Sequence, residues 1–312
     1  MSLSIVFEDN HLVVVDKPAG LATMGSAETE PSLARDVQAY LKHKYGKPGN
    51  VYLGVVSRLD SVTSGLIVFA KTSKAAARLT HQFRERTVAK WYIAAVPTVQ
   101  CKKGDHAPTA DSAAWYDSAQ VLWEDTLWKD DDAHRMRRRR STDRSDDKPF
   151  GAKQLGAKPD GAKQLGAKPF GANRSGQTES GDEAAGQPGQ VATLRWRLLG
   201  RGPGFDLVLV QLQTGRKHQI RVQFAERGFP ILGDQKYGSP ISFPKGIALH
   251  SWRLGLTHPV TKVPLDFCQD LPKAWLGLPE LGIQPDVPHS LNRQSATPIA
   301  LLKNLAQNLR SA

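Results

Sequence analysis

The polar stretch 57–64 holds the residues best suited to nucleophilic or acid–base chemistry. It reads Ser-Arg-Leu-Asp-Ser-Val-Thr-Ser, and it separates two stretches, 51–56 and 65–70, that are expected to be strands. Loops at strand ends are where a rigid scaffold presents reactive groups, so Asp60 is the strongest acidic candidate for a chemical role. Taken alone, Arg58 and Asp60 are equally well explained as a surface ion pair worth about 0–1 kcal/mol.

A second stretch, Lys90-Trp91-Tyr92, lies inside the expected strand 88–96. Side chains alternate between the two faces of a strand, so Lys90 and Tyr92 share one face and Trp91 points to the other. Without further context, ordinary strand packing is the preferred interpretation.

The third stretch, 214–222, concentrates cationic donors at the start of an expected helix. The helix is predicted over 216–227, which places Lys217 and Arg221 on one face. A basic helix start of this kind suits phosphate contact. A solvated charged turn is the weaker alternative, because the stretch has no acidic neighbour until Glu226. The cationic or donor side chains are Arg216, Lys217, His218 and Arg221.

A fourth stretch, 231–238, reads Ile-Leu-Gly-Asp-Gln-Lys-Tyr-Gly. Its glycines and its acidic residue, Asp234, are typical of a turn. Taken alone, it is best explained as a plain surface turn.

Several other chemistries find no support in the sequence. The nine histidines form no metal-ligand spacing, and the two cysteines, Cys101 and Cys268, are isolated. A serine hydrolase would need a GxSxG elbow, and a nucleotide-binding loop would need GxGxxG or GxxxxGK followed by Ser or Thr. The sequence contains none of these motifs.

The formal net charge of +12, from 42 basic and 30 acidic side chains, suggests a polyanionic partner such as nucleic acid. The conspicuous arginine run at 135–140 contributes little, because acidic residues on both sides nearly cancel it. Residues 124–190 carry a net charge of +1, whereas residues 191–312 carry +8. The charge therefore favours nucleic-acid binding by the C-terminal third.

Short expected strands and occasional helices, without regular alternation, predict an α+β fold. Its sheet would be mixed and mainly antiparallel, flanked by helices and loops. Strands are expected at 4–8, 11–16, 51–56, 65–70, 88–96, 191–199, 205–213 and 248–256, with irregular strand and hairpin over 113–136. Helices are expected at 32–44, 72–86, 216–227 and 272–278.

A single domain is expected over 1–278, interrupted by a low-complexity insertion at 137–190. The insertion contains a ten-residue repeat, 151–160 and 161–170, that varies only at its last position. Its few apolar groups cannot offset the entropy of ordering, so the insertion is predicted to be disordered. A passive loop is favoured over a mobile basic arm that gathers RNA. A docked terminal helix is expected in the C-terminal tail, 279–312.

The sequence predicts a cytoplasmic protein without membrane contact. No stretch approaches the roughly 18 apolar residues that suggest a transmembrane helix. Acidic residues interrupt the first 16 residues, which argues against a signal peptide.

Five blocks, taken in order, resemble one protein family. They read SRLDSVTSGL, KWY, TGRKHQIRV, ILGDQKYG and ALHSWRLGLTHP, and the opening IVFEDNHLVVVDKPAG is similar as well. Together they closely resemble the RluA-type RNA pseudouridine synthases, from about residue 4 to residue 268 with the insertion between. The order RLDxxTSG, KxY and GRxHQIR is highly specific.

The resemblance implies an isomerase that converts a uridine of RNA into pseudouridine and needs neither cofactor nor metal. The catalytic fold of that family would occupy 1–278. By the same resemblance Asp60 is the nucleophile, Tyr92 lies against the uracil ring as proton acceptor from C5, and Arg221 pairs with Asp60. Arg58 would fill the stack left by the flipped uridine. The other residues expected to bind RNA are Lys90, Arg216, Lys217 and His218.

These implied roles agree with physical chemistry. A nucleophilic carboxylate must be ionised, which a nearby guanidinium favours. Extruding a base costs roughly a few kcal/mol, which an inserted side chain partly offsets. An aromatic ring stacked on a base contributes ~1–3 kcal/mol. The route stays open between attack of Asp60 at C1′, attack at C6, and a base role toward a glycal.

Two positions, Ser57 and Gln223, depart from the family pattern, which often has histidine there. No S4-like RNA-binding domain precedes the motifs, so target choice is expected to come from the catalytic domain and its loops. The expected partner is rRNA or tRNA, and the expected state is a monomer. The alternative is a catalytically inactive RNA-binding protein on the same fold; the presence of Asp60, Tyr92 and Arg221 favours the enzyme.

Overall fold

The computed structural model describes residues 3–25, 30–98, 121–131, 133–139, 189–202 and 204–280. Its strands are β1 (Ser4–Glu8), β2 (Leu12–Lys17), β3 (Gly54–Val55), β4 (Ser64–Ala70), β5 (Ala89–Pro97), β6 (Val121–Asp130), β7 (Arg135–Arg139), β8 (Gln190–Gly202), β9 (Phe205–Leu212), β10 (Leu249–Thr257) and β11 (Pro264–Cys268). Its helices are α1 (Leu33–Lys44), α2 (Ser73–Arg84) and α3 (Gln219–Ala225), with 3-10 segments at Gln235–Tyr237 and Lys273–Glu280.

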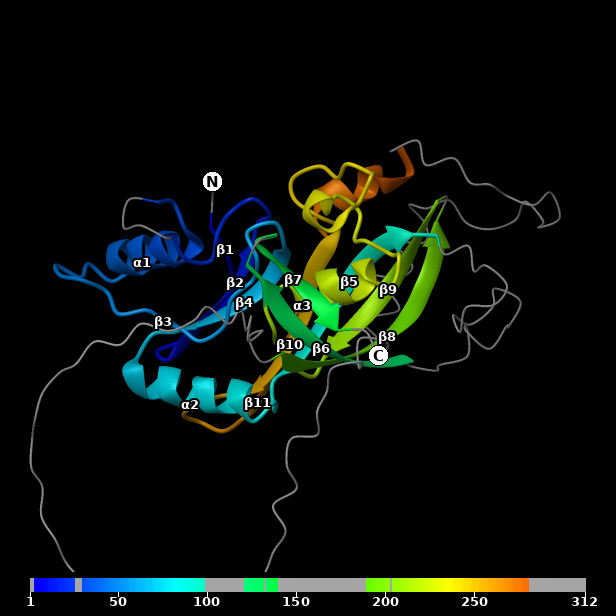
Figure 1. Ribbon diagram of the computed structural model, residues 1–312. Coiled ribbons are helices and arrows are strands. Elements are labelled where there is room, and N and C mark those ends of the chain that lie inside the picture. Colours follow the sequence, from blue (N-terminus) through cyan, green and yellow to red (C-terminus); the bar gives the residue numbers. More distant parts are fainter. Residues whose placement is uncertain are drawn as a thin grey trace, which may run out of the picture.

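One sheet runs through the described part of the chain in the order β1-β2-β4-β10-β5-β9-β8-β6-β7, with β3 beside β4 and β11 beside β10 (Figure 1). Its neighbours are antiparallel except β4 and β10. The expected α+β fold with a mixed, mainly antiparallel sheet is therefore confirmed.

The N-terminal part of the sheet is covered by α1 on one face and α2 on the other (Figure 1). Apolar residues in β2 and β4 run continuously rather than alternating with polar ones, as expected for strands buried on both faces. In β2, Leu12 and Val14 pack with α2, whereas Val13 and Val15 pack with α1. This half of the sheet thus holds the loop after β3 between two cores.

The C-terminal part of the sheet builds the largest core, in which β5, β9 and β10 pack against α3. Ile220 and Phe224 of α3 are buried there, as their helical spacing predicts. The site-bearing segments of both halves meet at β10, which pairs with β4 on one side and β5 on the other.

The parallel pair of β4 and β10 is short, with His250 opposite Ser64 and Ser251 opposite Gly65. Gly65 has φ of +109°, and a Cβ built on it would lie 2.3 Å from the carbonyl oxygen of Ser251. Only glycine allows the two backbones to approach this closely. The glycine therefore fixes the distance between the loop that precedes β4 and the strand β10.

Two expected elements differ in extent from the structure. The strand expected at 51–56 is reduced to β3, which pairs only with the end of β4. The helix expected over 216–227 begins at Gln219, because His218 has a left-handed backbone with φ of 54° and cannot continue a helix. Lys217 and Arg221 therefore do not share a helix face, and that prediction is wrong.

The ends of the expected insertion are also corrected. Arg137–Arg139 belong to β7, and Gln190 belongs to β8, because β6 pairs with both strands. Residues 140–188, and the C-terminal tail from 281 on with its expected helix, lie outside the described residues.

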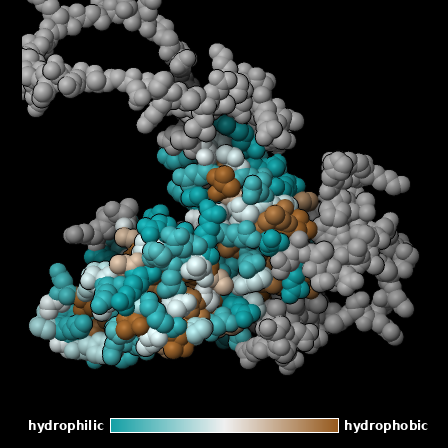
Figure 2. All heavy atoms as spheres, turned by 90° about the horizontal axis from the view of Figure 1, so that it is seen from below, coloured by the Kyte–Doolittle hydropathy of each residue, from teal (hydrophilic) through white to brown (hydrophobic). Residues whose placement is uncertain are grey.

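The face shown in Figure 2 is mainly hydrophilic, with hydrophobic side chains in separate spots. Single exposed apolar side chains are ordinary on protein surfaces. Among the described residues, no helix has the length and apolar character needed to span a membrane.

Candidate active site

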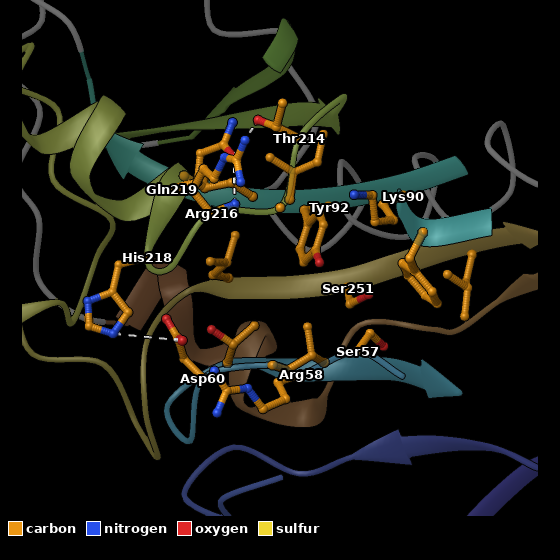
Figure 3. A pocket seen from close by; sticks show the side chains of 18 of the residues that line it. Ser57, Arg58, Asp60, Lys90, Tyr92, Thr214, Arg216, His218, Gln219 and Ser251 are labelled. Carbon is orange, nitrogen blue, oxygen red and sulfur yellow. Dashed lines mark hydrogen bonds and ion pairs between the residues drawn. The ribbon is translucent and has the colours of Figure 1, made fainter. Parts of the chain in front are cut away.

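A cleft of about 480 Å³ opens where the loop after β3, the start of β5, the segment from β9 to α3, and β10 meet (Figure 3). Every site residue expected from the sequence lines it except Lys217, which is exposed outside it. The lining members of that set are Arg58, Asp60, Lys90, Tyr92, Arg216, His218 and Arg221. Segments that are distant in sequence are thus brought together.

Asp60 and Arg221 are in direct contact in this cleft. Nη1 of Arg221 donates a hydrogen bond to Oδ2 of Asp60 at 2.8 Å. The Arg221 side chain is 6% exposed and the Asp60 side chain 28% exposed, so the carboxylate is accessible while its partner is buried. The guanidinium therefore stabilises the ionised carboxylate without blocking it.

Asp234 holds the other side of the same guanidinium. Nε of Arg221 donates to Oδ2 of Asp234 at 2.6 Å, and Nη2 donates to Oδ1 at 2.8 Å. Burial alone would lower the pKa of Arg221, but its bonds to Asp234 and Asp60 raise that pKa above the ordinary value. Arg221 is therefore a permanent cation that is fixed from one side and presented to Asp60 on the other.

His218 faces the other oxygen of the Asp60 carboxylate (Figure 3). Its Nε2 is 3.8 Å from Oδ1 of Asp60, and its Nδ1 is 2.8 Å from the hydroxyl of Tyr237. Burial lowers the pKa of His218 to about 4, although Asp60 acts in the raising direction. The imidazole is therefore neutral near pH 7.

Tyr92 and Lys90 project from the same face of β5 into the cleft, as expected, while Trp91 packs in the core. Burial raises the pKa of Tyr92 to about 12, and a hydrogen bond with Ser251 opposes that shift in part. Tyr92 is thus a protonated phenol near pH 7. Burial lowers the pKa of Lys90 to about 8, and the neighbouring Arg86 lowers it further.

The cleft is strongly cationic. Asp60 is the only acidic side chain that lines it among the described residues. Arg216 is held near the mouth by a bond from its Nε to the carbonyl oxygen of Val191 at 3.0 Å. The cationic lining side chains are Arg58, Arg84, Arg86, Lys90, Arg216 and Arg221.

Lys17 supports the loop that carries Asp60, a role that the sequence reading missed. Its Nζ donates to the carbonyl oxygens of Pro18, Leu21 and Ser61 at 2.9, 2.7 and 3.1 Å. Lys17 is fully buried, and burial lowers its pKa to about 8 while Asp60 acts in the opposite direction. The Lys-Pro-Ala-Gly turn was the available signal, but turn chemistry alone does not show which way a lysine points.

Asp234 and Tyr237 were missed as well. The stretch 231–238 is not a plain surface turn, because Asp234 is 1% exposed and Tyr237 is buried. A 3-10 turn at Gln235–Tyr237 places both beside Arg221, whose guanidinium lies 5.0 Å from the Tyr237 ring centroid. The available signal was the position of this stretch in the ordered set of family-like blocks.

No group of three or more His, Cys, Asp or Glu side chains suited to holding a metal ion occurs within the described ranges.

The fold defines the class of protein. The human protein RNA pseudouridylate synthase domain containing 4 superposes with a TM-score of 0.58 at 21% identity, covering 88% of this chain and 90% of that one. The human domain-containing 1 protein gives a TM-score of 0.56, also at 21% identity, with 100% and 96% coverage. The fold is therefore that of the pseudouridine synthases.

The sequence places the chain within that class. Residues 11–226 match the model of the RNA pseudouridylate synthase family. The chain belongs to this family, a family of isomerases, which confirms the resemblance noted from the motifs.

Two curated relatives are also named as pseudouridine synthases. Ribosomal large subunit pseudouridine synthase D of Nitrosomonas europaea is 30% identical over 268 residues, 82% of this chain. The enzyme of the same name from Pseudomonas aeruginosa is 28% identical over 293 residues, 89% of this chain. The matches span 58% and 71% of those relatives' own lengths.

Proposed function

We propose that this chain converts a uridine of ribosomal RNA into pseudouridine in the cleft around Asp60. The single observation that carries the proposal is the pairing of Asp60 with the buried Arg221 inside a cationic cleft that also presents Tyr92. The N1–C1′ bond of the uridine breaks and a C5–C1′ bond forms. The proton of C5 leaves and N1 gains one, so the reaction needs no cofactor.

The roles follow from position and charge. Asp60 is the nucleophile, because its carboxylate is accessible and is held at one oxygen by Arg221. The aromatic ring of Tyr92 provides an apolar surface against which the uracil ring can lie, through either its edge or its face. Because it is protonated near pH 7, it can accept the C5 proton only by passing its own proton on.

RNA binding is assigned to the cations of the cleft. Arg58 lies on the loop that carries Asp60 and is suited to fill the stack left by a flipped base. Lys90, Arg216 and His218 line the cleft and would contact the flanking nucleotides. Lys217 is exposed outside the cleft and would contact RNA only beyond it.

The substrate class is inferred from the relatives, two of which are named for the large ribosomal subunit. Transfer RNA is the competing substrate. Mapping pseudouridines in total RNA with and without the gene decides between them, since the lost sites identify the target RNA. The cytoplasmic location and the monomeric state expected from the sequence are part of this proposal.

The activity is tested by Asp60→Asn, with Asp36→Asn as the control. Asp36 is an exposed carboxylate in the first turn of α1, away from the cleft. Asp60→Asn is expected to abolish pseudouridine formation while folding and RNA binding persist, because an amide cannot replace a nucleophilic carboxylate. Asp36→Asn should behave as wild type. Pseudouridine formation by the Asp60→Asn variant would contradict the assignment. Absence of pseudouridine formation in the wild type and in both variants would favour an inactive RNA-binding protein.

A further inference from the structure

Two hydrogen bonds link the backbone of β7 to His218, which faces the Asp60 carboxylate. The backbone N–H of Met136 donates to the hydroxyl oxygen of Tyr237 at 3.1 Å. That hydroxyl lies 2.8 Å from Nδ1 of His218, whose Nε2 faces Asp60. These bonds start in the β6–β7 hairpin, a segment for which the proposed function otherwise gives no role.

The protonation states of the groups determine which is the donor and which the acceptor in each of these hydrogen bonds. Tyr237 accepts from Met136 and stays protonated, because burial raises the pKa of its phenol. A buried hydroxyl proton needs an acceptor, and Nδ1 of His218 is the one in reach. Nδ1 is then unprotonated, so a neutral imidazole must carry its proton on Nε2.

The neutral state of His218 follows from its surroundings. Besides the carboxylate of Asp60, the charged groups around it are Arg221, Lys217 and Lys236, all cationic. Three cations and burial outweigh one carboxylate, so the ring takes up no second proton near pH 7. The Asp60 carboxylate therefore faces the neutral Nε2–H group of His218 rather than a second positive charge.

We propose that Tyr237 is a positioning residue that holds His218 as the Nε2–H tautomer, so that His218 orients the free oxygen of Asp60. Arg221 holds Oδ2, and His218 stands 3.8 Å from Oδ1, close enough to tighten into a hydrogen bond when substrate closes the cleft. Two donors would then fix the plane of the carboxylate. This inference rests on the proposed function, since it assigns the carboxylate its orientation for that reaction.

The first test is spectroscopic and needs no activity. The ¹⁵N resonances of the His218 ring distinguish a protonated nitrogen from an unprotonated one. In the full chain at pH 7 we expect protonated Nε2 and unprotonated Nδ1, and a loss of that pattern in Tyr237→Phe. A protonated Nδ1 in the wild type, or an unchanged pattern in Tyr237→Phe, overturns the proposal. Because no substrate is involved, this result stands apart from the proposed activity.

The second test separates tautomer control from mere packing. Glutamine at position 218 carries an N–H donor at about the reach of Nε2 and has no tautomer to set. Tyr237→Phe should lower kcat by about 10-fold to 100-fold in the wild-type background, with KM for RNA nearly unchanged. In a His218→Gln background the same change should cost little. An equal loss in both backgrounds indicates a packing role and overturns the proposal.

The control is Tyr40→Phe, which also deletes a phenol hydrogen bond, the one from Tyr40 to Glu8 at 2.9 Å. Tyr40 lies on α1 outside the cleft, so this variant should keep wild-type kcat and the wild-type His218 resonances.

Discussion

At the scale of single residues, the site depends on one arginine shared between two carboxylates of different exposure. Asp234 is buried and Asp60 is partly exposed, and Arg221 forms an ion pair with each of them. A buried charge that loses its only partner is costly, commonly about 3–5 kcal/mol. The structural and chemical roles of Arg221 can therefore be separated by mutation.

We predict that Arg221→Gln destabilises the protein by about 3 kcal/mol and abolishes activity, since it leaves Asp234 buried without its cation. Adding Asp234→Asn removes the unpaired charge, so the double variant should regain most of the stability and none of the activity. Urea unfolding and a pseudouridine assay measure the two effects. Full stability in the single variant, or activity in the double one, contradicts the shared role.

The sequence identified site residues whose chemical type and motif suggest a role. It missed residues whose role depends on their being buried in the fold. Asp60 and Arg221 stand out because a carboxylate and a guanidinium recur in ordered motifs. Asp234 and Tyr237 lie in a turn and Lys17 is the last residue of β2, positions where the same residue types usually face water, and only the tertiary fold buries them. Local patterns contain no information on which side of a turn the core will lie.

At the scale of elements, the site is assembled by the parallel pairing of β4 with β10. Periodicity and caps predicted α1 and α2 well; in α2, the Thr72 hydroxyl accepts from the Ala75 N–H at 3.2 Å. The pairing of β4 with β10 could not be predicted, because Ser64 and His250 are 186 positions apart. The start of α3 was misjudged because His218 has a left-handed backbone, which the helical spacing of the residues around it does not reveal.

We predict that Gly65→Ala lowers the free energy of unfolding by about 3 kcal/mol or more, because its Cβ would collide with the Ser251 backbone. The matched control is Gly228→Ala, where φ is +87° and nothing lies within 4 Å of the added Cβ. Strain alone should cost that variant about 1 kcal/mol. Equal losses in the two variants would show that the close approach of β4 and β10 is unimportant.

At the scale of the whole molecule, the arginine-rich run is partly neutralised by ion pairs within the β6–β7 hairpin. Arg137 pairs with Asp130, and Arg138 with Asp125, within the β6–β7 hairpin. The near-neutral charge of this stretch therefore corresponds in part to ion pairs, whereas cationic side chains outnumber the single acidic one in the lining of the cleft, among the described residues.

We predict that deleting 141–186 leaves stability and turnover largely intact. β7 and β8 flank β6, so Arg139 at the end of β7 and Gln190 at the start of β8 lie about 10 Å apart, a distance that a few residues can span. Loop-closure entropy varies slowly with length, so shortening this connection should change the free energy of unfolding by at most about 2 kcal/mol, and in the stabilising direction. Urea unfolding and turnover in vitro are the measurements.

Leu127→Ala serves as the comparison for that deletion, because Leu127 is a fully buried residue of β6 within the hairpin. Its loss should cost about 2–5 kcal/mol and shows that the assay detects damage to the hairpin. A deletion as harmful as Leu127→Ala would mean that the segment is not a passive loop.

The central place of β10 also has a consequence for biosynthesis. The edges of β4 and β5 that β10 will occupy are made early, and they stay without a partner until β10 leaves the ribosome. Unpaired strand edges are templates for aggregation, and domains otherwise tend to fold from the N-terminus as they are made. The nascent chain is therefore most vulnerable until β10 has emerged, and the cleft around Asp60 is complete only when β10 has paired with β4 and β5.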